Sequence, residues 1–484
     1  MAMIALMRKK LRYVSTLAAV MSGMACPGLV AAQERDPMQF YDADGLKVRG
    51  HLQFGLNAIT ESNLFWDLAG TTAPGSGFDP EASWLEAYIK PGISFEYQLD
   101  TGAFFYGKLS AVSSYTWGTD AFDTGDNGAT TLEEAYLAIR GALSTELSYD
   151  LSIGPRELNL GTGMLIASGG TSGFERGALK FGPRKAWEMA AIGRLSYGNL
   201  TGTAFYVDPN ELPSSDGNNE LAGLDLRYDD PGGGFLGITF VDVLNSESPY
   251  PQAAPGGVGA PSVTPGARED TKTLSFYAKT NPFERALENW AFTADYAYQW
   301  NDRIDMEAWA GRLTAGYTFA NLPWTPNLTL GYQTFSGDDP NTTKLERFDP
   351  LYYQGSPSAW ATGSKSASTF INSNVNALSL ALRVQPTPRD TVTVRYSRIR
   401  ANELNSPVQF GQATRVDLNG NVVSGVTDAH LSDDLFIEYN RTINRNTFLS
   451  GGVAISYPGD GIDNVLGRNA DPWTGGYLNV VVNF

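Results

Sequence analysis

The sequence predicts an all-β fold, a transmembrane antiparallel β-barrel of about 18 strands. Segments of about ten residues, from Val48 to the C-terminal Phe484, alternate apolar with polar side chains, as in strands with one apolar and one wet face. The connections between them are alternately short and long, which is typical of outer-membrane barrels. After residue 33, no apolar run approaches the ~20 residues of a membrane-spanning helix. Amphipathic strands without such a helix favour a closed barrel.

The first 32 residues have the composition of a secretory signal peptide. Basic residues at positions 8, 9, 10 and 12 precede an apolar stretch, and Val30-Ala-Ala32 forms a small-residue cleavage site before Gln33. The predicted organisation is a signal peptide, residues 1–32, followed by an outer-membrane barrel, residues 33–484. The single cysteine, Cys26, leaves with the signal, so thiol chemistry is not expected. Acylation of Cys26 is the alternative, although Gly23 stands where lipoprotein signals carry a large aliphatic residue.

The charge balance is strongly acidic. The whole chain has 35 Lys and Arg against 52 Asp and Glu, and loss of the four basic residues in the signal leaves a formal charge of −21. Such a surface does not bind nucleic acid through its phosphates, so a nucleic-acid partner is not expected.

The strands follow one another in a regular rhythm. The first is predicted at 48–58 and the second at 85–99, after a loop of about twenty residues rich in Gly, Thr and Pro. The last, 477–484, ends in Phe484, and such an ending resembles the signal that the barrel-assembly machinery recognises. Short connections are predicted near 100, 141–147, 198, 230–233, 281–288, 321–326, 385–390 and 443–446. Longer ones are predicted near 60–82, 118–130, 155–185, 208–219, 245–270, 337–369, 402–430 and 457–472, with a compact exception at 301–305.

A soluble β-sandwich or propeller is the competing fold, because it also has alternating strands and turns. Its outer strand faces would carry charge, whereas the outward faces of the clearest strands here carry almost none. Aromatic residues also stand at segment ends, as in the girdles at membrane interfaces: Tyr115, Trp117, Trp290, Tyr298 and Trp300.

Residues 312–353 carry a resemblance to a known family. The runs are Leu313-Thr-Ala-Gly-Tyr-Thr-Phe319, Trp324-Thr-Pro-Asn-Leu-Thr-Leu-Gly-Tyr332, Ser336-Gly-Asp-Asp-Pro340 and Arg347-Phe-Asp-Pro-Leu-Tyr-Tyr353. In this order they resemble the signature of the alginate export family of outer-membrane β-barrels. The resemblance implies passage of an anionic polysaccharide. Residues 151–158 are similar to the family's Gly-Arg-Gln motif, which supplies a pore arginine, but Pro155 stands where that Arg usually is and Arg156 where the Gln is.

Seven arginines are candidates for lining the pore. Six share the parity of the lumen face of their strands, and Arg156 enters through the motif resemblance. Arginine favours anions because its guanidinium is always charged and presents several donors. Bracing of the wall is an equally open role, with Arg227 pairing Asp225 or Asp229, and Arg140 pairing Glu134. The candidates are Arg140, Arg156, Arg194, Arg227, Arg312, Arg383 and Arg395.

Catalysis, cofactors and metal ligands find little support. Only His51 and His430 are present, and neither is placed for a lipid-facing serine hydrolase; zinc spacings and phosphate loops are missing from the sequence. The acidic stretches Asp120/Asp123/Asp126 and 336–340 are predicted to be solvated loop tips or contacts to lipopolysaccharide through cations. Binding of Ca²⁺ by these stretches stays open.

The sequence therefore predicts an outer-membrane channel for passive passage of a polar, anionic solute or polysaccharide. A substrate-selective uptake porin and a structural or surface-interaction barrel without transport are the alternatives. Expected partners are outer-membrane lipid, lipopolysaccharide, the permeating solute and, during biogenesis, the barrel-assembly machinery. The identity of the permeant, the direction of transport, and whether 155–185 and 337–369 fold into the lumen are left open.

Overall fold

The structure is a computed structural model that describes residues 38–64, 79–121, 124–171, 173–280, 288–354, 362–363, 369–409, 415–416 and 422–484. Residues 40–484 form one compact unit, which is described here by itself. The predicted signal peptide, residues 1–32, lies outside the described residues. Within these ranges, no helix is long and apolar enough to cross a membrane.

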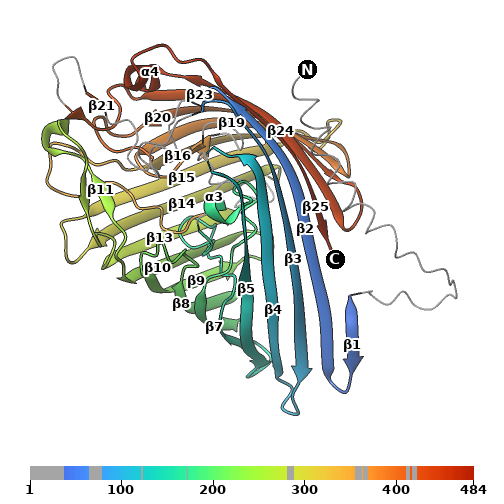
Figure 1. The fold of residues 1–484 in the computed structure, drawn as a ribbon. Coiled ribbons are helices and arrows are strands. Elements are labelled where there is room, and N and C mark those ends of the chain that lie inside the picture. Colours follow the sequence, from blue (N-terminus) through green and yellow to red (C-terminus); the bar gives the residue numbers. More distant parts are fainter. Residues whose placement is uncertain are drawn as a thin grey trace. The chain divides into compact units, whose positions relative to one another are not determined.

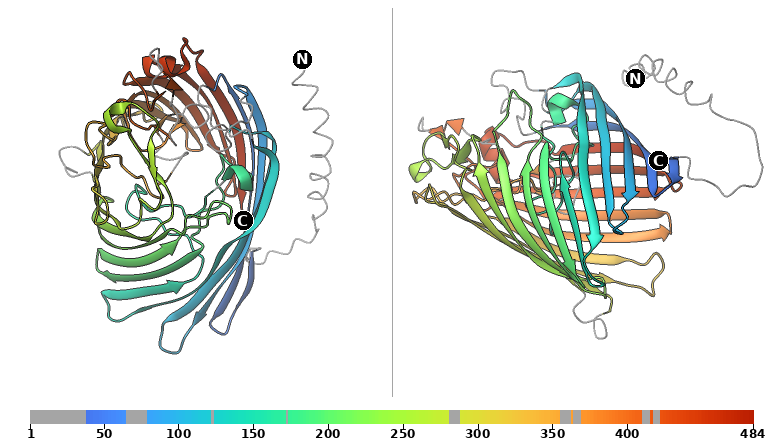
Figure 2. Two further views of the ribbon diagram at one scale, coloured as in Figure 1. Left: turned by 60° about the vertical axis from the view of Figure 1, so that its left-hand side comes forward. Right: turned by 90° about the horizontal axis from the view of Figure 1, so that it is seen from below.

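The unit is a closed antiparallel β-barrel of 18 strands, as predicted (Figures 1 and 2). Sequential strands pair with each other, and β25 pairs with β2 from Gln53 opposite Asn483 to Ser62 opposite Thr474, so the sheet has no free edge along this seam. The strands are β2 (Leu46–Ser62), β3 (Ala82–Gln98), β4 (Phe104–Thr119), β5 (Gly125–Ala142), β6 (Leu147–Ile153), β7 (Met189–Tyr197), β8 (Leu200–Asp208), β9 (Glu220–Asp229), β10 (Phe235–Asn245), β13 (Thr271–Thr280), β14 (Trp290–Asn301), β15 (Glu307–Thr318), β16 (Asn327–Phe335), β19 (Val375–Thr387), β20 (Asp390–Ala401), β23 (His430–Thr442), β24 (Thr447–Pro458) and β25 (Trp473–Asn483).

A further strand, β1 (Gln39–Ala43), pairs with β2 in a hairpin. Its two-residue turn is Asp44-Gly45, with φ of 53° and 76°. Positive φ at both central residues is the geometry of a type I′ turn, for which Asp-Gly is a preferred pair.

The predicted alternation of short and long connections is confirmed, with one correction. The stretch 118–130 was expected to be a long loop because it is rich in Gly, Asp and Asn, but β4 runs to Thr119 and β5 begins at Gly125. Pairing between strands outweighs the turn signal here: Tyr115 lies opposite Gly128, where a Cβ would come within 2.3 Å of the Ser114 carbonyl oxygen. Glycine permits this close approach of two backbones.

Smaller elements lie in the long connections. They are α3 (Gly173–Arg176), β11 (Tyr250–Gln252), η1 (Pro255–Gly257), β12 (Ser262–Thr264), β17 (Thr362–Gly363), β18 (Thr369–Phe370), β21 (Arg415–Val416), β22 (Val422–Val423) and α4 (Asp460–Leu466). These connections meet at the barrel end opposite the short turns, which is the extracellular end in outer-membrane barrels.

The two faces of the wall differ as the parity of the sequence predicts. On β15, Leu313 is 64% exposed on the outside, whereas its neighbour Arg312 is 7% exposed on the inside. Outward positions on the other strands are also large and apolar, among them Leu330 and Leu478. An apolar outer face and a polar inner face are what a membrane-spanning barrel requires.

Candidate functional site: the barrel lumen

Three of the predicted arginines come together on the inner face of β5–β7. Arg140 on β5 lies opposite Asp150 on β6, and Asp150 lies opposite Arg194 on β7. Arg156, just beyond β6, approaches the same carboxylate, with 3.9 Å between its Nη1 and Asp150 Oδ1. We call Arg140, Arg156 and Arg194 the arginine cluster.

Aromatic rings and carboxylates hold the arginine cluster in place. The Arg140 guanidinium lies 5.1 Å from the ring centre of Tyr106 and pairs with Glu96. The Arg156 guanidinium lies 4.4 Å from the ring centre of Tyr136, close enough for a cation–π contact. Tyr106 donates its hydroxyl hydrogen bond to Asp150, at 2.6 and 2.7 Å from the two carboxylate oxygens. Three guanidinium groups thus lie near two carboxylates, Asp150 and Glu96, and the Asp225 carboxylate on β9 also acts electrostatically on Arg194.

The expected pairing of Arg140 with Glu134 is wrong. The two residues are six positions apart on one strand, which is roughly 20 Å at the rise of a β-strand, beyond the reach of an ion pair. Glu134 instead pairs with Lys108 on β4.

A β-bulge explains why a second glutamate beside Glu134 also faces inward. The β4–β5 register shifts between Ser110 and Ala111, which lie opposite Glu134 and Leu132 and skip Glu133. Both Glu133 and Glu134 are buried. A bulge of this kind redirects a side chain, so strict alternation cannot predict its orientation.

Two other predicted arginines pair with carboxylates of the wall. Arg227 pairs with Asp229, at 2.7 Å between Nη2 and Oδ1, which confirms one of the two partners expected for it. Arg312 donates to Asp295 Oδ2 from Nε at 3.0 Å and from Nη2 at 2.8 Å. Both members of this second pair are buried, so the guanidinium neutralises a carboxylate that has left water.

Arg383 and Arg395 differ in their surroundings. Arg395 donates to the carbonyl oxygen of Gly363 at 2.6 Å and lies 5.5 Å from the ring centre of Phe436. Arg383 is exposed on β19, opposite Asn327 and Thr393. Within the described part of the chain, no carboxylate lies within ion-pair distance of Arg383.

The long connection between β6 and β7, residues 154–188, folds into the lumen, and we call it the inner loop. Glu86 on β3 accepts hydrogen bonds from the backbone N–H of Lys180 at 2.8 Å and of Phe181 at 3.0 Å. Glu133 accepts in the same way from Lys185 at 2.9 Å and Ala186 at 3.2 Å. Figure 2 shows α3, which belongs to this loop, inside the ring of strands. Buried wall carboxylates therefore fix the inner loop against β3 and β5.

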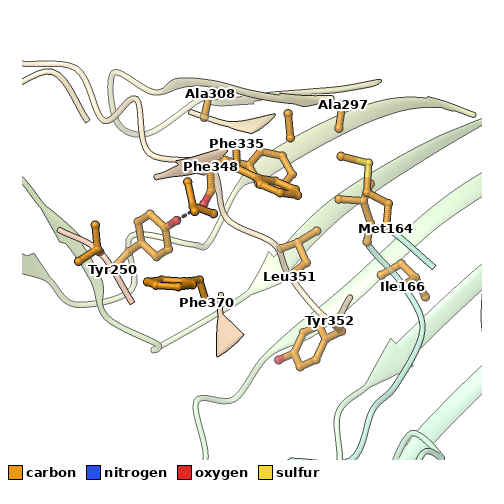
Figure 3. Close-up of a cluster of buried hydrophobic side chains, with 14 of the residues drawn as sticks. Met164, Ile166, Tyr250, Ala297, Ala308, Phe335, Phe348, Leu351, Tyr352 and Phe370 are labelled. Atoms are coloured by element: carbon orange, nitrogen blue, oxygen red, sulfur yellow. Dashed lines mark hydrogen bonds between the residues drawn. The ribbon is translucent and has the colours of Figure 1, made fainter. Parts of the chain in front are cut away.

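The inner loop also contacts the connection between β16 and β19, residues 336–374, which we call the cap loop. Ile166 and Tyr352 form a parallel bridge, with 2.9 Å from the Tyr352 nitrogen to the Leu165 oxygen. Met164, Ile166, Leu351 and Tyr352 lie in one apolar cluster with Phe335 and Phe348 (Figure 3). Both long connections therefore fold inward, and they pack on one another.

Hydrogen bonds to further loops hold the cap loop. Tyr250 donates its hydroxyl to the Phe348 carbonyl at 2.6 Å (Figure 3). The Asp338 carboxylate accepts from the backbone N–H of Ala253 at 2.6 Å and of Glu346 at 2.7 Å. Burial raises the pKa of Asp338 to about 6, although these hydrogen bonds lower it.

The prediction that the acidic stretches are solvated loop tips is wrong for Asp120 and Asp338, because both are buried. Asp338 is committed to backbone donors, whereas Asp123 of the other stretch lies outside the described residues. In the described ranges, no group of three or more His, Cys, Asp or Glu side chains is arranged to hold a metal ion.

The two histidines serve local contacts. His51 Nε2 lies 2.7 Å from Ser94 Oγ on the inner side of the β2–β3 pair. His430 Nε2 lies 2.8 Å from Asp433 Oδ2 on the outer side of β23.

The model of the alginate export family matches residues 262–471. The matched part contains Arg312, Arg383 and Arg395 but not the arginine cluster. No curated protein matches the chain.

Three solved bacterial outer-membrane proteins are similar in fold. OccAB4 of Acinetobacter baumannii has a TM-score of 0.49 and 11% identity, covering 90% of this chain and 98% of its own. OprB of Pseudomonas putida, in its high-pH structure, has a TM-score of 0.43 and 9% identity, covering 90% of this chain and 94% of its own. OmpF of Salmonella typhi, in complex with daunomycin, has a TM-score of 0.41 and 13% identity, covering 92% of this chain and 100% of its own. At these scores and identities, none of the three informs on the solute of this chain.

Proposed function

We propose that this bacterial outer-membrane barrel, which carries an alginate export domain in residues 262–471, is a channel for passive passage of a polar, anionic solute or polysaccharide. The observation that carries the proposal is the arginine cluster, which brings three guanidinium groups together on one part of the lumen wall. The Arg140 side chain is 46% exposed, so a solute in the lumen can reach it, whereas that of Arg156 is 15% exposed.

The position of the cluster favours an effect on ions in the lumen. The excess acidic residues of the chain lie largely in loops and turns, and salt screens exposed charges beyond a Debye length of ~8 Å. Inside the barrel, low-dielectric walls concentrate the field of whichever charge dominates locally. Arg140, Arg156 and Arg194 would then attract anions at their own level, even though the whole protein is acidic.

The other arginines take different roles in this proposal. Arg383 adds a positive charge without a described carboxylate partner. Arg227 and Arg312 have their own carboxylates and contribute mainly to the wall, while Arg395 anchors the cap loop through Gly363.

A barrel without transport is the second candidate, and the packing of the inner loop on the cap loop favours it. If these loops close the lumen at all times, the arginine cluster only stabilises the wall. A substrate-selective uptake porin would share the same lumen and differ in its solute and direction.

Conductance of the purified protein in planar bilayers separates these functions. A channel gives discrete conductance steps, and short oligomers of a uronic acid should reduce the open current more than neutral oligosaccharides of equal length. Absence of steps over a wide voltage range would favour the barrel without transport. Equal block by charged and neutral oligomers would contradict an anionic permeant.

A further inference from the structure

Two arginines on β20 face away from the lumen at the extracellular end of the wall. Arg398 and Arg400 are exposed, whereas the intervening residues Ser397, Ile399 and Ala401 are buried on the inner side. This alternation places both guanidinium groups on the lipid-facing side of one strand.

Their level is that of the membrane interface. Arg398 lies opposite Leu378 on β19, which lies opposite Tyr332 on β16. On the other side, Arg398 lies opposite Asp433 on β23, which lies opposite Tyr457 on β24. Tyr332 and Tyr457 are exposed on the outer face, and aromatic residues of this kind gather at headgroup depth.

The apolar band of the wall lies on the membrane side of the two arginines. Two positions along the strands toward the short turns, the next set of residues on the outer face is also exposed. It consists of Leu330, Leu380, Tyr396 and Leu435. An arginine facing lipid is strongly destabilising at the bilayer midplane and much less so near the interface. Arg398 and Arg400 are therefore tolerated only among the lipid headgroups.

The carboxylate opposite Arg398 is that of Asp433, which offsets part of the positive charge on this face. Asp433 accepts the Tyr396 hydroxyl hydrogen bond, and its other oxygen lies 2.8 Å from His430 Nε2. Among the residues that the structure describes, no carboxylate forms an ion pair with Arg398 or Arg400. Two neighbouring cations thus face a layer whose fixed anions are phosphates, and guanidinium groups bind phosphate with paired hydrogen bonds.

We propose that Arg398 and Arg400 form a binding site for the phosphate of an outer-leaflet glycolipid headgroup. The exposed tyrosines beside them border the headgroup, and the leucines on their membrane side contact the acyl chains. The site is on the outside of the wall and is independent of what passes through the lumen.

Lipid retention by the full barrel tests the proposal. Native mass spectrometry would count lipid A molecules, which carry phosphates on a glucosamine disaccharide, on the wild type and on an Arg398→Gln/Arg400→Gln variant. Arg389→Gln/Arg445→Gln is the matched control, because it removes the same charge from exposed residues near the short turns. Heat-modifiable gel mobility checks that all three barrels are folded.

The expected result is a loss of lipid A affinity of at least about tenfold in Arg398→Gln/Arg400→Gln, which we call the β20 variant, and no loss in the control. Dephosphorylated lipid A should bind the wild type as weakly as lipid A binds the β20 variant. Equal retention by the wild type and the β20 variant would overturn the proposal. Competition by inorganic phosphate at the same concentration as lipid A would also overturn it, because the site would then bind free anions rather than a headgroup.

Discussion

An arginine on a lumen face either neutralises a carboxylate beside it or keeps its charge available to a solute, and its neighbours decide which. Arg312 and Asp295 are both buried and hydrogen-bonded to each other, so their charges cancel. Arg383 is exposed, and Arg140 is half-exposed over Tyr106. Sequence parity placed all three on the inner face, but only the register between strands separates these roles.

Substitution of Arg312 should destabilise the barrel, because Arg312→Ala leaves Asp295 buried without its cation. We expect a loss of about 3–5 kcal/mol in the free energy of unfolding, measured by urea titration in detergent or lipid. Arg312→Ala/Asp295→Ala should recover part of this loss. The exposed Arg383→Ala is the control and should change stability little. Equal stability of Arg312→Ala and the wild type would show that the pair does not brace the wall.

At the scale of elements, the inner loop is the part that sequence periodicity could not place. Its glycine-rich, polar ends resemble a surface loop, and its fixation depends on Glu86 and Glu133, which lie on distant strands. One signal was present: five large apolar residues fall within positions 158–166, more than an exposed loop usually carries, and all five are buried: Leu158, Leu160, Met164, Leu165 and Ile166. Strands and short turns, by contrast, depend on local alternation and were predicted well.

Removal of one carboxylate should loosen the inner loop. Glu86→Ala deletes the acceptor for the Lys180 and Phe181 backbone N–H groups, so hydrogen exchange of residues 176–187 should become faster while that of β14 and β15 stays unchanged. Glu146→Ala, in an exposed short turn, is the control. Unchanged exchange in Glu86→Ala would contradict a role for the Glu86 hydrogen bonds, and Glu133 and the apolar contacts would then hold the loop.

The cap loop should respond to pH through Asp338. Its pKa of about 6 lies above the ordinary value near 4. The Asp338 carboxylate therefore binds a proton more tightly when the cap loop is folded than when it is unfolded. The stability of the cap loop should increase as pH falls from about 6 to about 4. Hydrogen exchange of residues 336–354, corrected for intrinsic rates, measures this. Asp338→Asn should abolish the pH dependence, whereas loss of protection on acidification would contradict the assignment.

For the whole molecule, the even number of strands fixes which connections share a side of the membrane. The sequence was sufficient to predict the number of strands. Each short or long connection separates two strands, so the strands can be counted without any knowledge of their pairing. The sequence was not sufficient for the contents of the lumen, since Asp150, Tyr106 and Tyr136 join the arginine cluster only through side-by-side strands.

Topology can be checked on intact cells. Epitope tags in 246–270 and in 402–429 should be accessible from outside, whereas a tag at 388–389 should be hidden until the outer membrane is permeabilised. Surface labelling at 388–389 would show that the barrel is inverted with respect to this assignment.

The reversal potential across single barrels in a salt gradient tests most directly whether the arginine cluster makes the lumen attractive to anions. At low salt, the wild type should have an anion-to-cation permeability ratio above one. Arg140→Gln/Arg156→Gln/Arg194→Gln should lower this ratio, whereas Arg389→Gln/Arg445→Gln should leave it unchanged. A wild-type barrel that prefers cations at low salt, or a triple variant with an unaltered ratio, would contradict an anion-selective lumen and leave the arginines as braces of the wall.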